Sequence, residues 1–488
     1  MPQRPFSREG TWMFPPTVDE LVPAAHPARF VAMFVDALDR AAWGELGVAI
    51  DGAARGAAEY HPRALLGVWL YGFMTGVRSS RKLEGACRDQ VPYLWLTGWQ
   101  RPDHNTLWRF YQAHRAGMRR LLKRTVKTAV RAGLVDLAVQ AVDETKLAGN
   151  AAKARTYDRE GLERLLARTE AAITDLEAQN SGGEDPPPPT LPAELAQRAA
   201  LRERVQQALA VVTAEEGPTR INLTDPDAVL VKGRQGYLAG YNGQAQVAGL
   251  DPVVAGGTGL LITAADLVAE AADHGQLVRL RDQSVEHTGV APAVQLADGG
   301  YHSVENLVAC AERNQTVVMP EAQHARLDSP YHKDAFVYDE QTDTYTCPEG
   351  QVLRFGSLKI YRDQPDRPPS RVYRGVPAAC RACPAFGTCT TNQHHGRTLE
   401  IGPDDATLRR HRAWMTTDEA RRRYARRKTL PEPVFGILKE QQAARRLLLR
   451  GLDQVRAEWA LLATAFNLRT LARVWQAGRL ASHQLSPP

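Results

Sequence analysis

LVDLAVQAVDETK, residues 134–146, is the stretch at which the pattern of this 488-residue chain changes from helical to extended. It is a short apolar run rich in Val and Leu that ends in acidic residues, which is typical of a buried strand. Asp143 is predicted at the C-terminal end of that strand. Ligands bind at this end of the strands in mixed α/β sheets, so the stretch indicates both a fold class and a first candidate site residue.

The residues before this strand, 1–135, are predicted to be helical. HPRALLGVWLYGFMTG (61–76) carries apolar residues at three-to-four spacing behind a proline suited to a helix N-terminus. Residues 103–130 continue this pattern, and one side of that segment is basic through Arg119, Arg120, Lys123, Arg124 and Lys127. Two interpretations stay open, a helical bundle with a solvated face and a helical domain that binds DNA.

The residues after the strand begin with a predicted helical hairpin at 151–220, which has a proline-rich tip, NSGGEDPPPPTLP (180–192). A short buried strand is predicted in APAVQLADGGY (291–301), where Asp298 follows the apolar run. The other predicted elements of this region are strands at 240–249, 252–266 and 316–320 and helices at 266–285 and 303–313. A strand meander followed by alternating strand and helix predicts an α/β fold with a mixed sheet.

The C-terminal part, predicted to be helical from 404 onward, concentrates the positive charge of the chain. The formal net charge is +6, and RRRYARRK (421–428) holds six basic residues in eight. Such a concentration indicates a polyanionic partner. Glu432 lies between two prolines directly after this block. A single carboxylate next to so many basic residues indicates a specific role for Glu432.

Asp143, Asp298 and Glu432 are the candidate catalytic carboxylates. Three carboxylates that converge repel one another unless a cation neutralises them. Mg²⁺ accepts a few carboxylates and leaves positions for phosphate oxygens, and two such ions about 3.5–4 Å apart can promote displacement at phosphorus. The arginines would then hold a nucleic-acid backbone beside the metal. A lone acid at a strand end is also a common turn residue or helix cap, and that reading stays open.

Several segments together resemble the DDE transposases of bacterial insertion sequences. The segments are YHPRALLGVWLYGFMTGVRSSRKLE (60–84), WLTGWQRPDHNTLWRF (95–110), VDETKLAGN (142–150), DPDA (225–228) with GYNGQAQV (240–247), ADGGYHS (297–303) and YARRKTLPEPVFGILK (424–439). The resemblance runs from about residue 10 to about residue 475. It implies an RNase H-like catalytic domain. One departure is Glu144, where the family more often has a small residue, so Glu144 is either a surface residue or an additional ligand.

The resemblance implies that Asp143, Asp298 and Glu432 are catalytic and bind two Mg²⁺ ions, or Mn²⁺. It also matches Tyr424, Arg427 and Lys439 to polar positions that attend the DNA of the transposon ends. The basic block adds Arg423, Arg426 and Lys428 as predicted contacts to phosphates. The predicted domains are an N-terminal helical DNA-binding domain (1–135), an RNase H-like core (136–150 and 221–329), the hairpin insert (151–220), a loop-rich, cysteine-rich insert (330–403) and C-terminal helices that carry the catalytic Glu432 and the basic block (404–488).

Four of the six cysteines cluster in the predicted insert. Cys380 and Cys383 are two residues apart, which lets both thiolates reach one tetrahedral zinc ion. Cys347 and Cys389 would complete four ligands, with His394 or His395 as substitutes. The alternative is that the thiols are reduced and bind nothing. A structural Zn²⁺ is the prediction, since four protein ligands would leave no open position for catalysis.

The sequence thus predicts a transposase that cleaves insertion-sequence ends and joins them to target DNA, acting on double-stranded DNA as a homodimer. Two alternatives are a catalytically inactive transposase-derived DNA-binding protein and a metal-dependent nuclease on the same fold. No apolar stretch reaches spanning length and no leader precedes the first helices. A cytoplasmic, nucleoid-associated protein without a membrane segment is therefore expected.

Overall fold

The computed structural model describes residues 17–50, 60–181, 191–233, 236–270, 273–321, 329–362 and 368–485. The chain forms two compact units, which are described separately. The first unit comprises Met1–Ala271, Leu280–Ala291 and Lys428–Pro488, and the second comprises Ala272–Arg279 and Pro292–Arg427.

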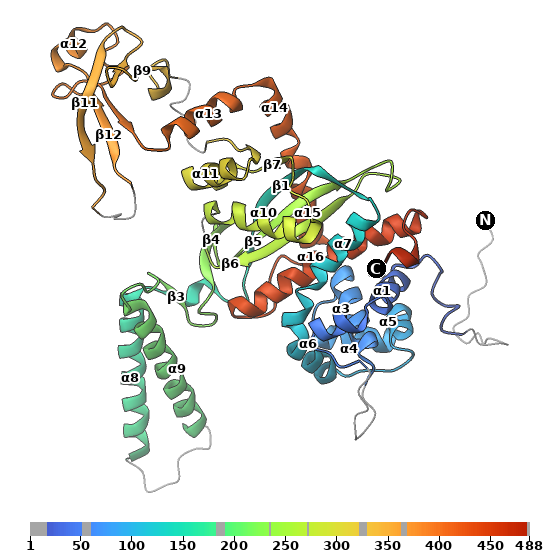
Figure 1. Cartoon of the computed structure of the whole chain (residues 1–488). Helices are drawn as coiled ribbons and strands as arrows, with labels where there is room; N and C mark the ends of the chain where they lie inside the picture. Colours follow the sequence, from blue (N-terminus) through green and yellow to red (C-terminus); the bar gives the residue numbers. More distant parts are fainter. Residues whose placement is uncertain are drawn as a thin grey trace, which may run out of the picture. The chain divides into compact units, whose positions relative to one another are not determined.

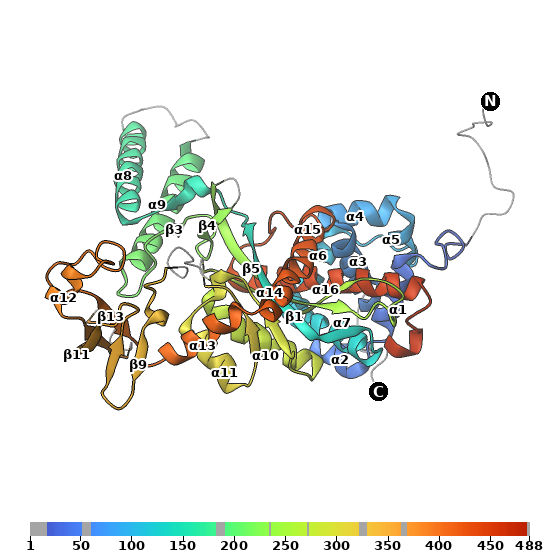
Figure 2. The ribbon, with the colours of Figure 1, turned by 90° about the horizontal axis from the view of Figure 1, so that it is seen from above.

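The N-terminal part of the first unit is helical, as predicted. Its helices are α1 (Pro27–Asp36), α2 (Arg40–Glu45), α3 (Pro62–Thr75), α4 (Ser80–Asp89), α5 (Val91–Leu96), α6 (His104–Met118) and α7 (Leu121–Arg131). Local sequence explains several of the helix starts, because Asp39, Ser79 and Asp103 each accept a backbone N–H as N-caps. The long C-terminal helix α16 (Leu452–Gln476) packs against α1, α3, α6 and α7 (Figure 2).

The sheet of the first unit is built on the long strand β5 (Gly236–Leu250). Strand β1 (Val135–Ala148), strand β4 (Val229–Gly233) and strand β6 (Leu260–Val268) all pair with β5 in antiparallel fashion. The predicted helix at 266–285 is wrong in its first residues, since Asp266, Leu267 and Val268 extend β6 in register with β5. The helix itself, α10 (Leu277–Thr288), begins later.

The predicted end of the first strand is also wrong. Strand β1 continues past Asp143 to Ala148, which pairs with Gly240 of β5. A Cβ atom at Gly240 would lie only 2.0 Å from the carbonyl oxygen of Leu147. The glycine therefore allows a close backbone approach that apolar patterning does not reveal. Asp143 lies within the ladder and not at its end.

The predicted helical hairpin is confirmed. Helices α8 (Arg159–Ser181) and α9 (Leu191–Thr213) lie side by side (Figure 1). The two-stranded pair β2 (Thr156–Tyr157) and β3 (Ile221–Asn222) closes its base. The hairpin has its own core, which comprises Leu162, Val205, Ala208, Ile221 and Leu223. Most of the predicted proline-rich tip, residues 182–190, lies outside the described residues.

The second unit contains the parallel pair β7 (Val294–Leu296) and β8 (Thr316–Val318), which α11 (Val304–Glu312) connects. Helix α13 (Asp405–Met415) packs on α11, and α14 (Asp418–Ala425) contacts β8. These elements confirm the predicted strands at 291–301 and 316–320 and the helix at 303–313. With antiparallel pairing in the first unit and parallel pairing here, the predicted α/β class with mixed strand pairing and an N-terminal helical region is confirmed.

The region 330–403 of the second unit, predicted to be loop-rich, contains an antiparallel sheet of short strands that was not predicted. Its strands, in the spatial order β13-β12-β11-β10-β9, are β9 (Val337–Asp339), β10 (Thr344–Thr346), β11 (Val352–Lys359), β12 (Ser370–Arg374) and β13 (Thr398–Ile401). Phe336, Tyr345, Leu353, Tyr373 and Leu399 form its core. The strands are short and each supplies few core side chains, so the pattern of alternation was too brief to read.

The described helices include none that combines the length and the apolar character needed to cross a lipid bilayer.

Candidate active site

Asp143 lies on the buried surface of β1. The residue is 7% exposed and pairs with Ala245 of β5, and its Oδ1 accepts the backbone N–H of Glu144 at 2.9 Å. Successive side chains of a strand point to opposite faces, so Glu144 points away from the face of Asp143. Glu144 forms an ion pair of 2.9 Å with Lys146 on its own side of the strand. The geometry favours a role for Glu144 other than that of an additional ligand.

Glu432 lies in the first turn of α15 (Pro431–Glu440) and is exposed. Pro431 and Pro433 fit this turn because the first N–H groups of a helix have no partner within it. The helix therefore begins earlier than Pro433. It buries Val434, Phe435 and Leu438 and packs against β1, β5 and α16, with the Phe435 ring stacked 6.5 Å from that of Trp459.

Two predicted residues far apart in sequence are thus carried by elements that pack together. Helix α15 carries Glu432 and contacts β1, which carries Asp143. Lys439 is in the last turn of α15, seven residues after Glu432 and half-buried. A spacing of seven residues returns to nearly the same face of a helix, so Lys439 and Glu432 share one side of α15.

Asp298 belongs to the second unit and lies two residues after the end of β7, whereas the predicted strand ended on Asp298 itself. It is the N-cap of a short 3₁₀ turn (Gly299–Tyr301), and its Oδ1 accepts the N–H of Gly300 at 2.9 Å. Its Oδ2 lies 3.3 Å from Nη2 of Arg427. Arg427 is only 8% exposed, so this guanidinium helps fix the direction of the carboxylate.

A second carboxylate, which the sequence analysis missed, lies beside Asp298. A Cβ atom at Gly300 would be 3.1 Å from Oδ1 of Asp298 and 3.3 Å from Oδ2 of Asp273. Asp273 is 8% exposed. Gly300 therefore keeps a space between two carboxylates that an alanine side chain would fill. The signal available in the sequence was Asp-His-Gly (273–275), a composition typical of turns within the segment predicted to be helical.

The other predicted DNA contacts lie around the end of α14. Arg423 forms an ion pair of 2.6 Å with Glu419 one turn earlier, and Tyr424 is half-buried. Arg426 and Lys428 are exposed. Contact of these residues with DNA stays a prediction, as does that of Arg427 and Lys439.

The convergence of all three carboxylates also stays a prediction, because Asp143 and Glu432 belong to the first unit and Asp298 to the second. Within the described ranges, no group of three or more His, Cys, Asp or Glu side chains is arranged so that it could hold a metal ion. The structure shows where each of the three acids lies on its own strand, turn or helix.

The four clustered cysteines line one small pocket of the second unit, together with Leu353 and Arg397. None of the six cysteines forms a disulfide. Burial raises the pKa of the Cys389 thiol, and the fields of Cys347, Cys380 and Cys383 raise it further, although Arg397 opposes them. His394 and His395 are exposed and do not line this pocket.

Backbone groups approach two of these sulfur atoms. Sγ of Cys380 accepts the N–H of Arg397 at 3.4 Å, and Sγ of Cys347 accepts the N–H of Gln351 at 3.2 Å. A Cβ atom at Gly375 or Gly396 would lie 3.0 Å from Sγ of Cys380. Both glycines thus let the backbone approach this sulfur closely.

A buried ion pair holds the segment between α15 and α16, and sequence patterns gave no sign of it. Nη1 of Arg78 lies 2.7 Å from Oε1 of Glu458, and their side chains are 4% and 2% exposed. Arg78 also donates to the carbonyl oxygens of Ala443 and Arg446. Glu458 accepts the N–H groups of Leu448 and Leu449. The pair therefore fixes the path of the chain directly after Lys439.

Two family models match the chain. Residues 346–472 match the model described as Transposase DDE domain. Residues 16–113 match the model described as Transposase domain (DUF772). The first match includes the four clustered cysteines, strands β11–β13, Glu432 and Lys439, and the second includes α1–α5 and most of α6. No curated relative matches the chain.

Proposed function

We propose that this chain, a member of the DDE transposase family, cleaves phosphodiester bonds at insertion-sequence ends and joins those ends to target DNA. The observation that carries the proposal is the packing of α15, with Glu432, against β1, with Asp143. It sets two acids of the predicted triad on touching elements, although most of the chain separates them. Asp298 completes the triad.

The residues present have the donor chemistry for Mg²⁺ or Mn²⁺. Asp143, Asp298 and Glu432 would hold two ions, which activate the attacking oxygen and stabilise the leaving one when bound. Arg427 orients Asp298 through the contact between Nη2 and Oδ2. The half-buried Lys439 would hold the phosphate next to the cut, where a fixed positive charge stabilises the charge that develops during displacement.

DNA is the proposed partner of the basic segment. Arg423, Tyr424, Arg426 and Lys428 would position the backbone of the transposon end through charge and hydrogen bonds. Joining two ends to one target requires two active sites, so the active complex is proposed to be a homodimer. The protein would then act at the nucleoid, in the cytoplasm.

The test is a cleavage and strand-transfer assay on the element's own ends, with Mg²⁺ and with chelator. Asp143→Asn and Glu432→Gln should abolish both reactions but leave binding of the ends within about twofold, because these changes are nearly isosteric. Glu440→Gln is the matched control, since it removes an acid from the same helix outside the triad. Cleavage without joining would support the nuclease, and end binding without any reaction in the unmodified protein would support the inactive DNA-binding protein.

We also propose that Cys347, Cys380, Cys383 and Cys389 hold one structural Zn²⁺. The shared pocket and the N–H donors at two sulfur atoms support this. Four thiolates form a closed tetrahedral site with Zn–S distances of about 2.3 Å. Since the four thiols are not arranged as a metal site here, the proposal includes a contraction of the pocket on binding.

Metal content measures this site directly. The purified protein should carry one zinc ion, and the Cys380→Ser, Cys383→Ser double variant should lose it. Cys87→Ala is the control, because Cys87 is a buried cysteine of the first unit. Equal zinc content in all three proteins would rule out the cluster as the site.

A further inference from the structure

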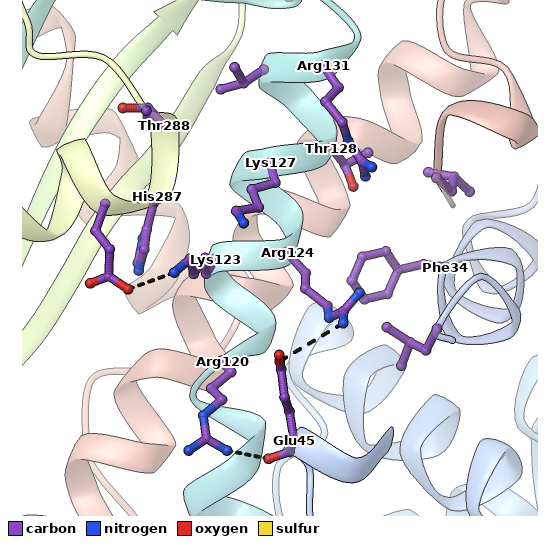
Figure 3. Close-up of a pocket in the computed structure, with 15 residues that line it drawn as sticks. Phe34, Glu45, Arg120, Lys123, Arg124, Lys127, Thr128, Arg131, His287 and Thr288 are labelled. Carbon is purple, nitrogen blue, oxygen red and sulfur yellow. Dashed lines mark hydrogen bonds and ion pairs between the residues drawn. The ribbon is translucent and has the colours of Figure 1, made fainter. Parts of the chain in front are cut away.

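A large cavity of the first unit lies far along the chain from the basic segment that follows α14. Its volume is ≈ 950 Å³, and α1, α2, α7, the end of α10 and Leu485 line it (Figure 3). Five cationic side chains line it, namely Arg120, Lys123, Arg124, Lys127 and Arg131. Only two carboxylates do so, Glu45 and Glu286. We call this cavity the α7 groove.

All five cations come from α7 or its N-cap, and the sequence places them on one side. Residues at spacings of three, four and seven share a face of a helix, which fits positions 120, 123, 124, 127 and 131. The opposite face is buried through Leu121, Leu122, Thr125, Val126 and Ala129. It packs against α16 and β6, so the core of the first unit holds the basic face rigidly.

Carboxylates neutralise only part of this charge. Nζ of Lys123 lies 2.7 Å from Oε1 of Glu286 (Figure 3). Nη2 of Arg124 lies 3.5 Å from Oδ1 of Asp39, which does not line the groove, and 4.0 Å from Oε2 of Glu45. Arg120 donates to the backbone carbonyl oxygen of Glu45 and not to a carboxylate. Lys127 is exposed. The groove therefore presents an excess of positive charge to solvent.

The titratable groups of the groove respond to this field. The pKa of Glu286 lies below its usual range, chiefly because Lys123 donates a hydrogen bond to it, and the charges of Lys123 and Lys127 add to the effect. Burial lowers the pKa of His287, and the same two lysines lower it further by repulsion, although the carbonyl oxygen of Thr263 and the Glu286 carboxylate oppose this. His287 is thus kept neutral beside the cations.

We propose that the α7 groove is a second DNA site, which binds the phosphate backbone of a double helix without reading its sequence. The inference rests on the proposed function and adds a contact surface on the helical N-terminal part. At 1.5 Å per residue, Lys127 and Arg131 lie about 10 and 16 Å along the axis from Arg120. That row is long enough to meet several phosphates of one strand, which follow each other at about 3.4 Å along the duplex axis.

The composition of the groove favours a duplex over a single strand. Sites for single strands stack bases on aromatic side chains, and among the lining residues Phe34 alone is a large aromatic, on a buried helix face. Asn and Gln, which read adenine in the major groove, do not occur among the lining residues. Lysines and arginines in a row along one helix can contact successive phosphates of the backbone. Salt-sensitive binding with no sequence preference is expected.

The experiment measures binding of a random-sequence duplex to the full-length protein between 50 and 200 mM NaCl. Each phosphate contact contributes a slope of about −0.9 in log K against log salt. The Arg120→Ala, Lys127→Ala double variant should therefore flatten the slope by nearly two units. Glu286→Gln should strengthen binding, because it releases Lys123 from its carboxylate partner. Arg119→Ala is the matched control, since Arg119 is exposed beside Arg120 but does not line the groove.

The outcomes separate this inference from the proposed function. The double variant could keep the salt slope of the unmodified protein, or its slope could flatten only as much as that of Arg119→Ala. Either result would contradict DNA binding by the α7 groove and would leave the catalytic proposal standing. An unmodified protein that binds an acidic polypeptide but no duplex would overturn both. A loss of cleavage in Asp143→Asn together with a normal salt slope would leave the groove in place, because Asp143 does not line it.

Discussion

At the scale of single residues, the contacts of Asp298 explain how its carboxylate is oriented. Its two oxygens have different partners, the N–H of Gly300 for Oδ1 and the guanidinium of Arg427 for Oδ2. A glycine at position 300 is needed because a methyl group there would approach the carboxylates of Asp298 and Asp273. The basic block therefore contains at least one residue whose partner in this structure is an acid of the candidate site.

This pairing predicts a specific defect in Arg427→Lys. A lysine keeps the charge but loses the planar fork that orients a carboxylate, so the Mg²⁺ concentration for half-maximal cleavage should rise by about 10- to 100-fold. Duplex binding should change little, since the charge remains. Arg426→Lys, at an exposed neighbouring position, is the control. A fall in DNA binding with unchanged Mg²⁺ dependence of cleavage would instead indicate that Arg427 contacts the phosphate backbone of DNA.

At the scale of elements, one buried ion pair determines how α15 continues into α16. Arg78 comes from the connection between α3 and α4, and Glu458 from α16. Between them they bind four backbone groups of the intervening segment, at Ala443, Arg446, Leu448 and Leu449. Burial raises the pKa of Glu458, while the charge of Arg78 opposes that shift. The N-terminal helices and the segment that follows α15 are thereby coupled within the first unit.

Removing one partner of this pair should strongly destabilise the protein. Arg78→Ala leaves a buried carboxylate uncompensated, which costs about 3–5 kcal/mol in free energy of unfolding. The double variant Arg78→Met, Glu458→Leu should recover part of that loss, because no buried charge remains. Arg88→Ala removes the 57% exposed partner of Glu84, which keeps its contact with His104, and should cost less than about 1 kcal/mol. Urea unfolding measures all three, and equal costs for Arg78→Ala and Arg88→Ala would contradict the coupling.

At the scale of the whole molecule, the chain combines parts that carry their own cores. The α8–α9 hairpin packs around Leu162 and Val205, and the sheet of the second unit packs around Tyr345 and Tyr373. Each inserts into the sequence of a larger unit, and the short pair β2–β3 closes the hairpin at its base. Separate cores of this kind make an insert dispensable for the folding of the rest.

Replacement of residues 161–217 by a short Gly-Ser linker should therefore leave the remaining fold intact. The expected protein is monodisperse, with an unfolding midpoint within a few degrees of the full chain and lower helix content. Val205→Asp in the full chain is the companion variant, since it should unfold the hairpin alone by placing a charge in its core. Aggregation of the deletion variant, or global unfolding of Val205→Asp, would show that the hairpin supports the rest of the fold.

The sequence by itself determined the features that depend on neighbouring residues. Helical periodicity predicted the N-terminal helices, the hairpin and α11, and short apolar runs predicted β1, β7 and β8. The sequence also indicated that Asp298 lies close to the end of a strand, that Glu432 lies between two prolines, and that Cys380 and Cys383 are two residues apart. Each of these features depends on a few adjacent positions. The resemblance carried by those local motifs agrees with the two family models that match the chain.

The tertiary structure alone decided the features that depend on distant partners. Strand β1 continues past Asp143 because Gly240, nearly a hundred residues later, admits its backbone. The sheet at 330–403 forms because aromatic residues from separate short strands share one core. Asp273 lies beside Asp298, and Arg78 binds Glu458, through contacts that no local pattern encodes. Strand pairing and burial arise only when distant segments come together during folding, so the local sequence around these residues could not predict their contacts.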